Sequence, residues 1–284
     1  MWIGRWHWIL EALVESVGFR ARKLRRGDDA AAVFARSQGV RGAYVVNALA
    51  AGEADGLVFE RDGSVAAIAW FGPRGNLVVV CSNRSRGYEA DVVRRVLASR
   101  YSWRIALGDA AVIDGIRARV GRSVLAHRDQ VYYVGGRDDA GALGAQADVR
   151  KPVGADRERL ARATLALNAS DLNIAPDRVD RRWLYRTIDD RCREGATMVL
   201  GPPGELWCKL DLGSQGPAGD VLEGVYTFPE HRGRGYATSL VAGAMAANVT
   251  PASLHVAAHN APARRAYEAA GMREAGTCRL LLLG

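Results

Sequence analysis

The stretch from Glu223 to Thr238 constrains the fold of this chain more than any other part of its sequence. A β-prone apolar run ends at Pro229, and a basic, glycine-containing turn then leads into a helical pattern. At such a turn, backbone N–H groups point outward and the helix dipole adds positive potential. Gly233 and Gly235 let a ligand approach the backbone closely, because they have no Cβ. The stretch predicts a pyrophosphate site, and without a following Gly-Lys-Ser/Thr it is not a nucleoside-triphosphate P-loop.

Two motifs in this part of the chain resemble those of the GNAT acetyltransferase superfamily. The family's pyrophosphate motif, Arg/Gln-x-x-Gly-x-Gly/Ala, matches the run from Arg232 to Ala237. A second family motif, Asn-x-x-Ala-x-x-x-Tyr-x-x-x-Gly-Phe, is matched further along the chain, with methionine in place of the final phenylalanine. Its matching residues are Asn260, Ala263, Tyr267, Gly271 and Met272. Either motif alone is a weak signal, but both in order and near the C-terminus are a strong one.

The predicted order of elements along residues 147–284 is also that of the GNAT fold. Periodicity and turn residues predict a strand near 147–153, two helices, three strands, and then a helix, strand, helix and strand. The first half repeats this order less clearly, and Arg84–Tyr88 matches Arg232–Tyr236 at four of five positions. We therefore predict an α/β fold with two GNAT-like domains in tandem. Each is expected to be a mostly antiparallel sheet flanked by helices.

Four segments are predicted along the chain. Apolar residues at helical spacing indicate an amphipathic N-terminal helix, expected to pack on the body of the protein or on a second subunit, which leaves a homodimer open. A run rich in Gly, Ala and Asp indicates a linker. The segments are the helix (1–18), a degenerate GNAT-like domain (19–137), the linker (138–146) and a catalytic N-acetyltransferase domain (147–284).

The first copy is predicted to be disabled for cofactor binding. Ser85 replaces a glycine of the turn, and Glu89 stands where the second copy has Ala237. A carboxylate at that place would repel a phosphate. Ile116 occupies the position of the motif tyrosine. We expect this domain to serve as a scaffold or as a wall of the acceptor site.

Composition narrows the choice of partners. The chain has 284 residues, a net charge of +8 and four scattered cysteines without zinc spacing, which favours reduced thiols in a cytoplasmic protein. No apolar run reaches the length of a membrane span, so no membrane partner is expected. The basic excess is mostly arginine and lies mainly outside the half with the motifs. We interpret it as a solvated basic face and do not expect a nucleic-acid partner.

The resemblance implies that acetyl-CoA is the co-substrate, with no metal. In the family, the strand before the turn and the next strand splay apart, and their backbone groups pair with the pantetheine arm. The resemblance thus assigns arm contacts to the strand end and pyrophosphate contacts to the turn, while Asn260 either reaches the arm or only caps its helix. The strand-end residues are Val225, Tyr226 and Thr227; those of the turn are Arg232, Gly233, Arg234, Gly235, Tyr236, Ala237 and Thr238.

Two catalytic residues are implied. Tyr267 matches the family tyrosine whose hydroxyl faces the CoA sulfur, and a phenol can protonate a departing thiolate; a core aromatic is the alternative. Glu223 is the candidate base, acting directly or through a water, with a plain polar strand residue as the alternative. His255 and His259 are four residues apart across a strand–helix boundary and do not predict a metal pair. The acceptor is expected at the helix pair within 155–194.

Three functions remain open from the sequence. The leading hypothesis is an N-acetyltransferase that moves an acetyl group from acetyl-CoA directly to a primary amine of a small molecule or peptide. A non-catalytic acyl-CoA-binding regulatory protein is the first alternative, suggested by the degenerate first copy. A tandem-GNAT aminoacyltransferase that uses a charged tRNA is the second, although the intact turn at 232–237 argues against it. The sequence does not identify the acceptor amine, the acyl-chain length or the oligomeric state.

Overall fold

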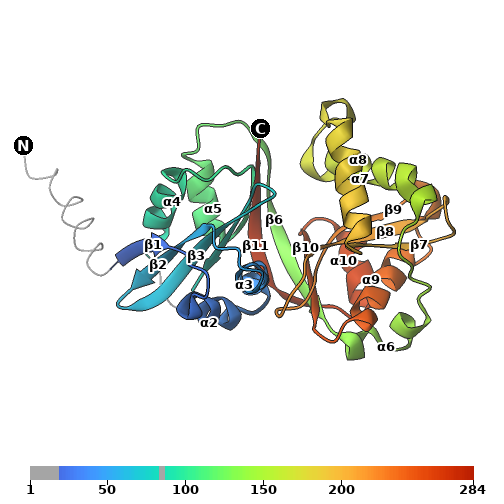
Figure 1. Cartoon of the computed structure of the whole chain (residues 1–284), viewed down its shortest axis with the longest axis horizontal. Coiled ribbons are helices and arrows are strands. Elements are labelled where there is room, and N and C mark those ends of the chain that lie inside the picture. The colour runs from blue at the N-terminus through green and yellow to red at the C-terminus, as the bar shows by residue number, and fades with distance from the viewer. Residues whose placement is uncertain (1–18, 83–86) are drawn as a thin grey trace, which may run out of the picture. The chain divides into compact units, whose positions relative to one another are not determined.

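The computed structural model describes residues 19–82 and 87–284. The helix predicted for 1–18 and most of the Arg84–Tyr88 repeat lie outside the described residues. The chain forms two compact units (Figure 1). The first unit runs to Ser123 and also includes Arg279–Gly284, whereas the second unit is Val124–Cys278.

The described residues of the first unit form a mixed sheet, and only one pair of neighbouring strands among them is parallel. Strands β1 to β4 pair antiparallel in chain order, β5 joins β4 in parallel, and β11 pairs antiparallel with β5. The strands are β1 (Phe19–Lys23), β2 (Gly56–Arg61), β3 (Ser64–Gly72), β4 (Asn76–Cys81), β5 (Ile105–Gly108) and β11 (Arg273–Leu283) from Arg279 onward. The helices are α2 (Asp29–Ser37), α3 (Ala43–Ala50), α4 (Glu89–Leu97) and α5 (Ala110–Arg117), with the short η1 (Gly39–Gly42).

Local sequence signals explain several of these boundaries. The Asp28 carboxylate accepts the N–H of Ala31 at 3.1 Å, which caps α2 as an aspartate at this position should. Asp62 and Gly63 both have positive φ, 50° and 76°, which matches the twist of a two-residue hairpin between β2 and β3. The start of α2 and the turn between β2 and β3 are thus set by a few neighbouring residues.

The second unit is also a mixed sheet, ordered β6-β10-β9-β8-β7, in which only β9 and β10 run parallel. The strands are β6 (Val124–Gly135), β7 (Thr197–Leu200), β8 (Cys208–Ser214), β9 (Val221–Thr227) and β10 (Ala252–Ala257), and β11 also begins in this unit. The helices are α6 (Arg137–Gln146), α7 (Arg157–Leu172), α8 (Arg181–Arg193), α9 (Tyr236–Ala247) and α10 (Ala261–Ala269). Short 3₁₀ turns are η2 (Gly154–Asp156), η3 (Pro176–Arg178) and η4 (Pro229–His231).

Two apolar layers cover the two faces of this second sheet. Leu210, Leu222 and Leu254 pack with α9 and α10 on one face. Val199 and Phe228 pack with α7 and α8 in a separate cluster on the other face, and Figure 1 shows these helices on opposite sides of the strands. The predicted fold, a mostly antiparallel mixed sheet flanked by helices in each half, is therefore confirmed.

The predicted boundary between the halves differs from the observed one. The predicted linker at 138–146 lies within α6, which is interrupted at Gly141 (φ 51°, ψ −146°). The small residues that suggested flexibility instead allow close packing, because a Cβ on Gly144 would come within 2.8 Å of the Ala242 carbonyl oxygen on α9. The compact units divide after Ser123.

Two strand assignments also change. The run 131–134 falls within the predicted first domain (19–137), but it is part of β6, which pairs with β10 in the second unit. The strand predicted near 147–153 is reduced to one bridge, between Arg150 and Val199. Both differences arise from pairing between residues far apart in sequence, which local patterns do not encode.

The last residues of the chain complete the core of the first unit. Arg279–Leu282 pair with β5, and Arg279 also makes an ion pair with Asp114 at 2.6 Å. Leu281 and Leu283 are fully buried in the same cluster as Ile113. A segment at the end of the sequence thus stabilises the unit at its beginning.

We expect Leu281→Ala to lower the free energy of unfolding by about 2–5 kcal/mol, because it removes a fully buried side chain and leaves a cavity. Urea unfolding of the full chain measures this effect, and Val249→Ala, at a side chain that is 89% exposed, is the control. Equal stability of the two variants would contradict the assignment of the C-terminal residues to the first unit's core.

Candidate active site

The parallel strands β9 and β10 diverge soon after they begin. Their registered pairing consists of Val221 with Ser253, and the Ser253 N–H donates to the Asp220 carbonyl oxygen at 2.8 Å. The corresponding strands of the first unit, β4 and β5, stay paired over four positions from Asn76 to Val79. Only the second unit therefore has the splayed strand pair that would leave backbone groups available to an extended ligand.

A β-bulge lies in β9 where the strands diverge. Gly224 and Val225 stand opposite Leu210 alone, because Asp211 pairs with Glu223 and Lys209 pairs with Tyr226. Gly224 has a φ of +55°, and a Cβ there would lie 2.9 Å from the Lys209 amine nitrogen. Glycine is therefore required on both conformational and steric grounds. Such a bulge redirects the strand, here at the predicted arm-binding residues.

The predicted pyrophosphate turn has the geometry that such a ligand needs. Gly233 and Gly235 have φ values of 73° and 77°, and nothing lies within 4 Å of either Cβ position. Helix α9 starts at Tyr236, with Gly235 as its N-cap. The exposed Arg232 donates from Nε to the Thr227 carbonyl oxygen at 3.2 Å, which ties the turn to the end of β9. Consecutive turn N–H groups of this kind form an anion-binding concavity.

Aromatic residues that the sequence analysis did not single out support this turn. Trp207, just before β8, stacks on Tyr236 at 4.8 Å between ring centroids and lies 5.8 Å from the His231 ring. On the far side of the turn, the Arg159 guanidinium lies 3.9 Å from the Phe228 ring centroid and pairs with Glu230 at 2.9 Å. In the sequence, Trp207 could have been singled out because it stands next to a buried strand. Its stacking partner Tyr236 is too distant in sequence for the contact to be predicted.

The remaining predicted cofactor residues surround the same strand end. Thr227 Oγ1 donates to Cys208 Sγ at 3.2 Å, and Arg232 lies 5.8 Å from the Tyr226 ring centroid. Val225 and Ala237 are partly buried against the α9–α10 core, and Thr238 is half-buried in the first turn of α9. Asn260 Oδ1 accepts the Ala263 N–H at 3.2 Å, so it caps α10, one of its two predicted roles.

Tyr267 approaches the site from the α10 face. It is 7% exposed, and its ring lies edge-on to Tyr133 at 6.1 Å. Burial raises the pKa of its phenol above the ordinary value, and the negative charge of Asp171 adds to the effect. A raised pKa keeps the hydroxyl protonated at neutral pH, which an acid needs. The alternative of a core aromatic is consistent with the same burial.

Glu223 lies among charged groups on the α8 face. Its carboxylate is 3.9 Å from Arg191, which also pairs with Asp211 at 3.4 Å. Lys209, 2% exposed, pairs with Asp211, and Thr197 donates to Asp211 at 2.8 Å. Burial alone would raise the pKa of Asp211, but Lys209 and Arg191 outweigh it and hold that pKa below its usual value. The cluster balances two cations with two carboxylates.

Glu223 and Tyr267 thus occupy opposite faces of the sheet around the divergence of β9 and β10. Glu223 pairs in register with Asp211, which faces Arg191 of α8. Tyr267 packs with Leu254 and Leu210 in the α9–α10 core. This arrangement can supply a proton acceptor from one face and a proton donor from the other.

The described residues of the first unit differ from these features around the equivalent position. The Glu89 carboxylate accepts the N–H of Gly87 at 2.8 Å, so the helix start has its own anion. A Cβ on Gly108 would overlap the Val79 carbonyl oxygen, which shows how closely β5 stays against β4. Ile116, at the tyrosine position, is fully buried in the core.

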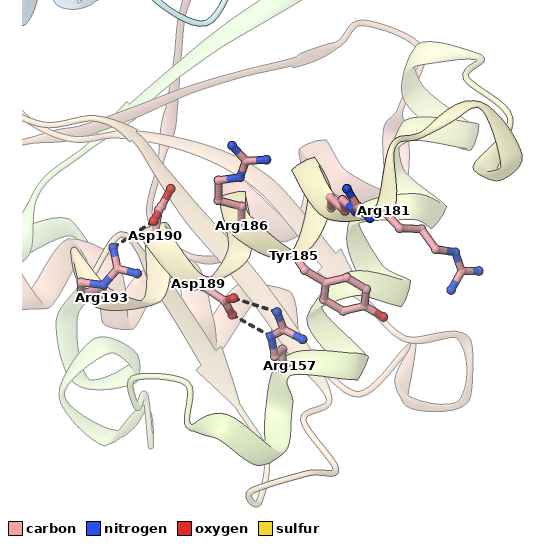
Figure 2. Close-up of a pocket in the computed structure, with 8 residues that line it drawn as sticks. Arg157, Arg181, Tyr185, Arg186, Asp189, Asp190 and Arg193 are labelled. Atoms are coloured by element: carbon pink, nitrogen blue, oxygen red, sulfur yellow. Dashed lines mark hydrogen bonds and ion pairs between the residues drawn. The ribbon is translucent and has the colours of Figure 1, made fainter.

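A surface pocket lies between α7 and α8, apart from the predicted site residues (Figure 2). Arg157 forms a two-pronged contact with Asp189, with both distances 2.7 Å, and Arg193 pairs with Asp190 at 2.9 Å. The lining residues are Arg157, Arg181, Arg182, Tyr185, Arg186, Asp189, Asp190 and Arg193. Five arginines against two aspartates make this pocket positively charged.

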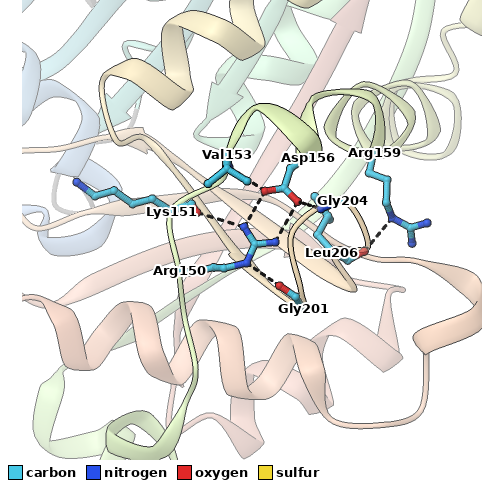
Figure 3. Close-up of polar contacts among 8 residues, drawn as sticks. All are labelled: Arg150, Lys151, Val153, Asp156, Arg159, Gly201, Gly204 and Leu206. Carbon is cyan, nitrogen blue, oxygen red and sulfur yellow. Dashed lines mark hydrogen bonds and ion pairs between the residues drawn. The ribbon is translucent and has the colours of Figure 1, made fainter.

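A buried carboxylate anchors the start of α7 (Figure 3). Asp156 is fully buried and accepts two hydrogen bonds from Arg150, at 2.7 and 3.0 Å. It also accepts the N–H groups of Val153 and Gly204, at 2.8 and 2.9 Å. Burial by itself would raise the pKa of Asp156, but these four donors lower it below its ordinary value.

We expect Asp156→Ala to destabilise the protein by about 3–5 kcal/mol, because it leaves Arg150 without its charge partner. A carboxyl with a depressed folded pKa contributes stability above its unfolded pKa of about 3.9, and that stability is lost as the pH falls. Urea unfolding from pH 7 down to pH 3 should show an acid loss in the wild type that is smaller in Asp156→Asn. The exposed Asp177→Asn is the control, and wild-type acid sensitivity in Asp156→Asn would contradict this role.

Comparison with known proteins agrees with this geometry. The FR47-like protein family matches residues 215–280, which contain both motifs. A GCN5-related N-acetyltransferase from Sphaerobacter thermophilus superposes with a TM-score of 0.56 at 17% identity, covering 93% of this chain and 94% of its own. A Drosophila protein gives 0.60 at 11% identity, covering 93% and 98%. A GNAT-family acetyltransferase from Colwellia psychrerythraea gives 0.50 at 11% identity, covering 93% and 100%.

These identities establish a likeness of fold: a mixed α/β sheet with helices on both faces. Together with the FR47-like match, they support the assignment of the chain to the GNAT superfamily. The search among curated proteins finds no match.

Within residues 19–82 and 87–284, no helix is both long and apolar enough to cross a membrane. No group of three or more His, Cys, Asp or Glu side chains in the same ranges is arranged to hold a metal ion.

Proposed function

We propose that this protein is an N-acetyltransferase that moves an acetyl group from acetyl-CoA directly to a primary amine. The observation that carries the proposal is the divergence of β9 and β10 immediately before the glycine turn at 233–235. It lies within the segment that matches the FR47-like family. We further propose a cytoplasmic location, which is supported by four free cysteines.

The residues of the second unit fit acetyl-CoA in extended form. The N–H groups of the turn at 232–238 would bind the pyrophosphate, with Arg232 and Arg234 adding positive charge. The β9 edge at 225–227 would pair with the pantetheine arm, and one of its N–H groups would polarise the thioester carbonyl. Bound acetyl-CoA supplies the acetyl group as an activated thioester.

Two side chains handle the protons in this proposal. Tyr267, kept neutral by burial, donates a proton to the departing sulfur. Glu223, on the α8 face, receives the proton of the amine directly or through a water. The amine would reach this face beside α7 and α8, the helix pair expected to hold the acceptor.

The test is a screen for acetyl transfer to primary amines. Wild-type protein and acetyl-CoA are incubated with diamines, amino sugars, amino acids and short peptides, and both released CoA thiol and acetylated product are measured. We expect product with at least one class. Binding of acetyl-CoA without product from any class would overturn the enzymatic function and favour a non-catalytic acyl-CoA-binding role.

A further inference from the structure

The strand register places His255 and Glu223 on the same side of the sheet, one on each of the diverging strands β10 and β9. These parallel strands pair at Val221 and Ser253, and the two residues each lie two positions further along. Side chains two apart on a strand share a face, so both point to the same side of the sheet. Leu254, between Ser253 and His255, packs into the α9–α10 core, so His255 points toward the α8 face.

Residues of β6 orient the imidazole of His255. Its Nδ1 lies 3.3 Å from Gln130 Oε1, and the ring stands edge-on to Tyr132 at 6.3 Å. With the Gln130 amide in this orientation, its oxygen accepts a hydrogen bond from Nδ1, and Nε2 is left as the basic nitrogen. Gln130 is 2% exposed, which fixes this contact in place.

The charges around His255 suit a base better than those around Glu223. Glu223 already has a cationic partner, because Arg191 lies 3.9 Å from its carboxylate. Removal from water lowers the pKa of His255; Glu223 opposes this effect and Arg128 adds to it. His255 is therefore neutral at neutral pH and can accept a proton, while Glu223 lies near enough to stabilise the resulting imidazolium.

A buried amide supports a ligand site at the same place. Gln130 Nε2 is buried and has no hydrogen-bond partner within the described part of the chain. Leaving a buried donor unsatisfied costs about 1–3 kcal/mol, and such donors call for a specific explanation. An acceptor molecule beside His255 would provide one.

We propose that His255 takes the proton from the acceptor amine at Nε2, with Gln130 and Glu223 as positioning residues. The inference rests on the proposed acetyltransferase function and deepens it, because it assigns the proton-accepting step to His255 and leaves Glu223 to stabilise the imidazolium. One ammonium proton passes to Nε2, the nitrogen–carbon bond forms and the carbon–sulfur bond breaks. Tyr267 protonates the sulfur and is reprotonated by the second nitrogen proton. His255 then releases one proton to solvent per turnover.

The first test needs no turnover. In the full chain labelled with ¹⁵N-histidine, the His255 signal is assigned by its absence in His255→Gln. We expect a neutral ring protonated at Nδ1 at pH 7, and a shift of its Nε2 signal when CoA is added. A ring charged at pH 7, or protonated at Nε2 instead of Nδ1, would overturn the inference.

The second test compares two amine probes. Benzylamine is protonated at neutral pH and needs a base, whereas methoxyamine is already neutral. General-base catalysis contributes roughly 10²–10⁴-fold, so His255→Gln should lose about 100-fold or more in kcat/KM with benzylamine and much less with methoxyamine. The exposed His259→Gln is the matched control and should change neither rate.

The outcomes separate the inference from the function on which it rests. Equal losses with both probes in His255→Gln, or no loss, would overturn the role of His255 while the acetyltransferase function stands. A wild-type protein that fails to bind acetyl-CoA, or gives no product with any amine class of the screen, would overturn the function and the inference together.

Discussion

Replacing Gly235 with glutamate should weaken acetyl-CoA binding by about 100-fold or more while the protein stays folded. Gly235 has a φ of +77°, a conformation that costs other residues about 1–2 kcal/mol. A carboxylate at this helix start would also repel the pyrophosphate that the turn is proposed to hold. In the first unit, the Glu89 carboxylate accepts the N–H of Gly87 near the start of α4, where a bound phosphate would need that donor.

Titration calorimetry with acetyl-CoA measures this effect, and Gly121→Glu is the matched control. Gly121 also has a positive φ, +61°, and open space around its Cβ position, but it lies in the first unit. The control imposes the same backbone strain and the same added charge without touching the turn. Undiminished binding by Gly235→Glu, or equal loss in both variants, would contradict the placement of the cofactor.

Replacing Tyr267 with phenylalanine should lower kcat by about 10²-fold or more and leave the affinity for acetyl-CoA unchanged. The substitution removes a single hydroxyl, so it tests proton donation to the sulfur and little else. Burial holds the pKa of this phenol above its ordinary value of about 10, so the wild-type donor stays protonated across the neutral range.

Steady-state turnover with benzylamine, together with calorimetry, separates the two effects. Tyr101→Phe is the control, because Tyr101 stacks on Phe71 in the first unit at 4.3 Å and has no place in the proposed site. A Tyr267→Phe variant with wild-type kcat would assign Tyr267 to the core alone. A variant that lost acetyl-CoA binding would instead give it a role in holding the cofactor.

Local features of the fold could be predicted because short stretches determine them. The Asp28 cap, the Asp62-Gly63 hairpin and the glycine turn before α9 each depend on a few neighbouring residues with special backbone or hydrogen-bonding properties. The two motifs also marked the correct strand–turn–helix. Patterns of this kind are complete within about a dozen residues.

Long-range pairing was not predictable in the same way. Nothing in the sequence of β6 shows that it pairs with β10, and nothing in Arg279–Leu282 shows that this run pairs with β5. Apolar strands have no partner preference strong enough to be seen in one sequence. The assignment of these strands, and with it the boundary between the halves, therefore required the structure.

The candidate site was predictable only in part for the same reason. Glu223 and Tyr267 stand at recognisable motif positions, whereas His255 and Gln130 come together through the pairing of β10 with β6. His255 drew attention in the sequence only as a possible partner of His259. The useful signal was that His255 lies two residues after Ser253 and so shares its face of the strand. This signal has meaning only once the register of Ser253 with Val221 is known.

The central claim is that the second unit alone binds acetyl-CoA, because its parallel strands diverge while those of the first unit stay paired. Calorimetric titration of the wild-type chain with acetyl-CoA tests this claim most directly through its stoichiometry. We predict one molecule bound per chain. Two molecules per chain would show that the first unit also binds the cofactor, and no binding would remove the basis for the proposed function.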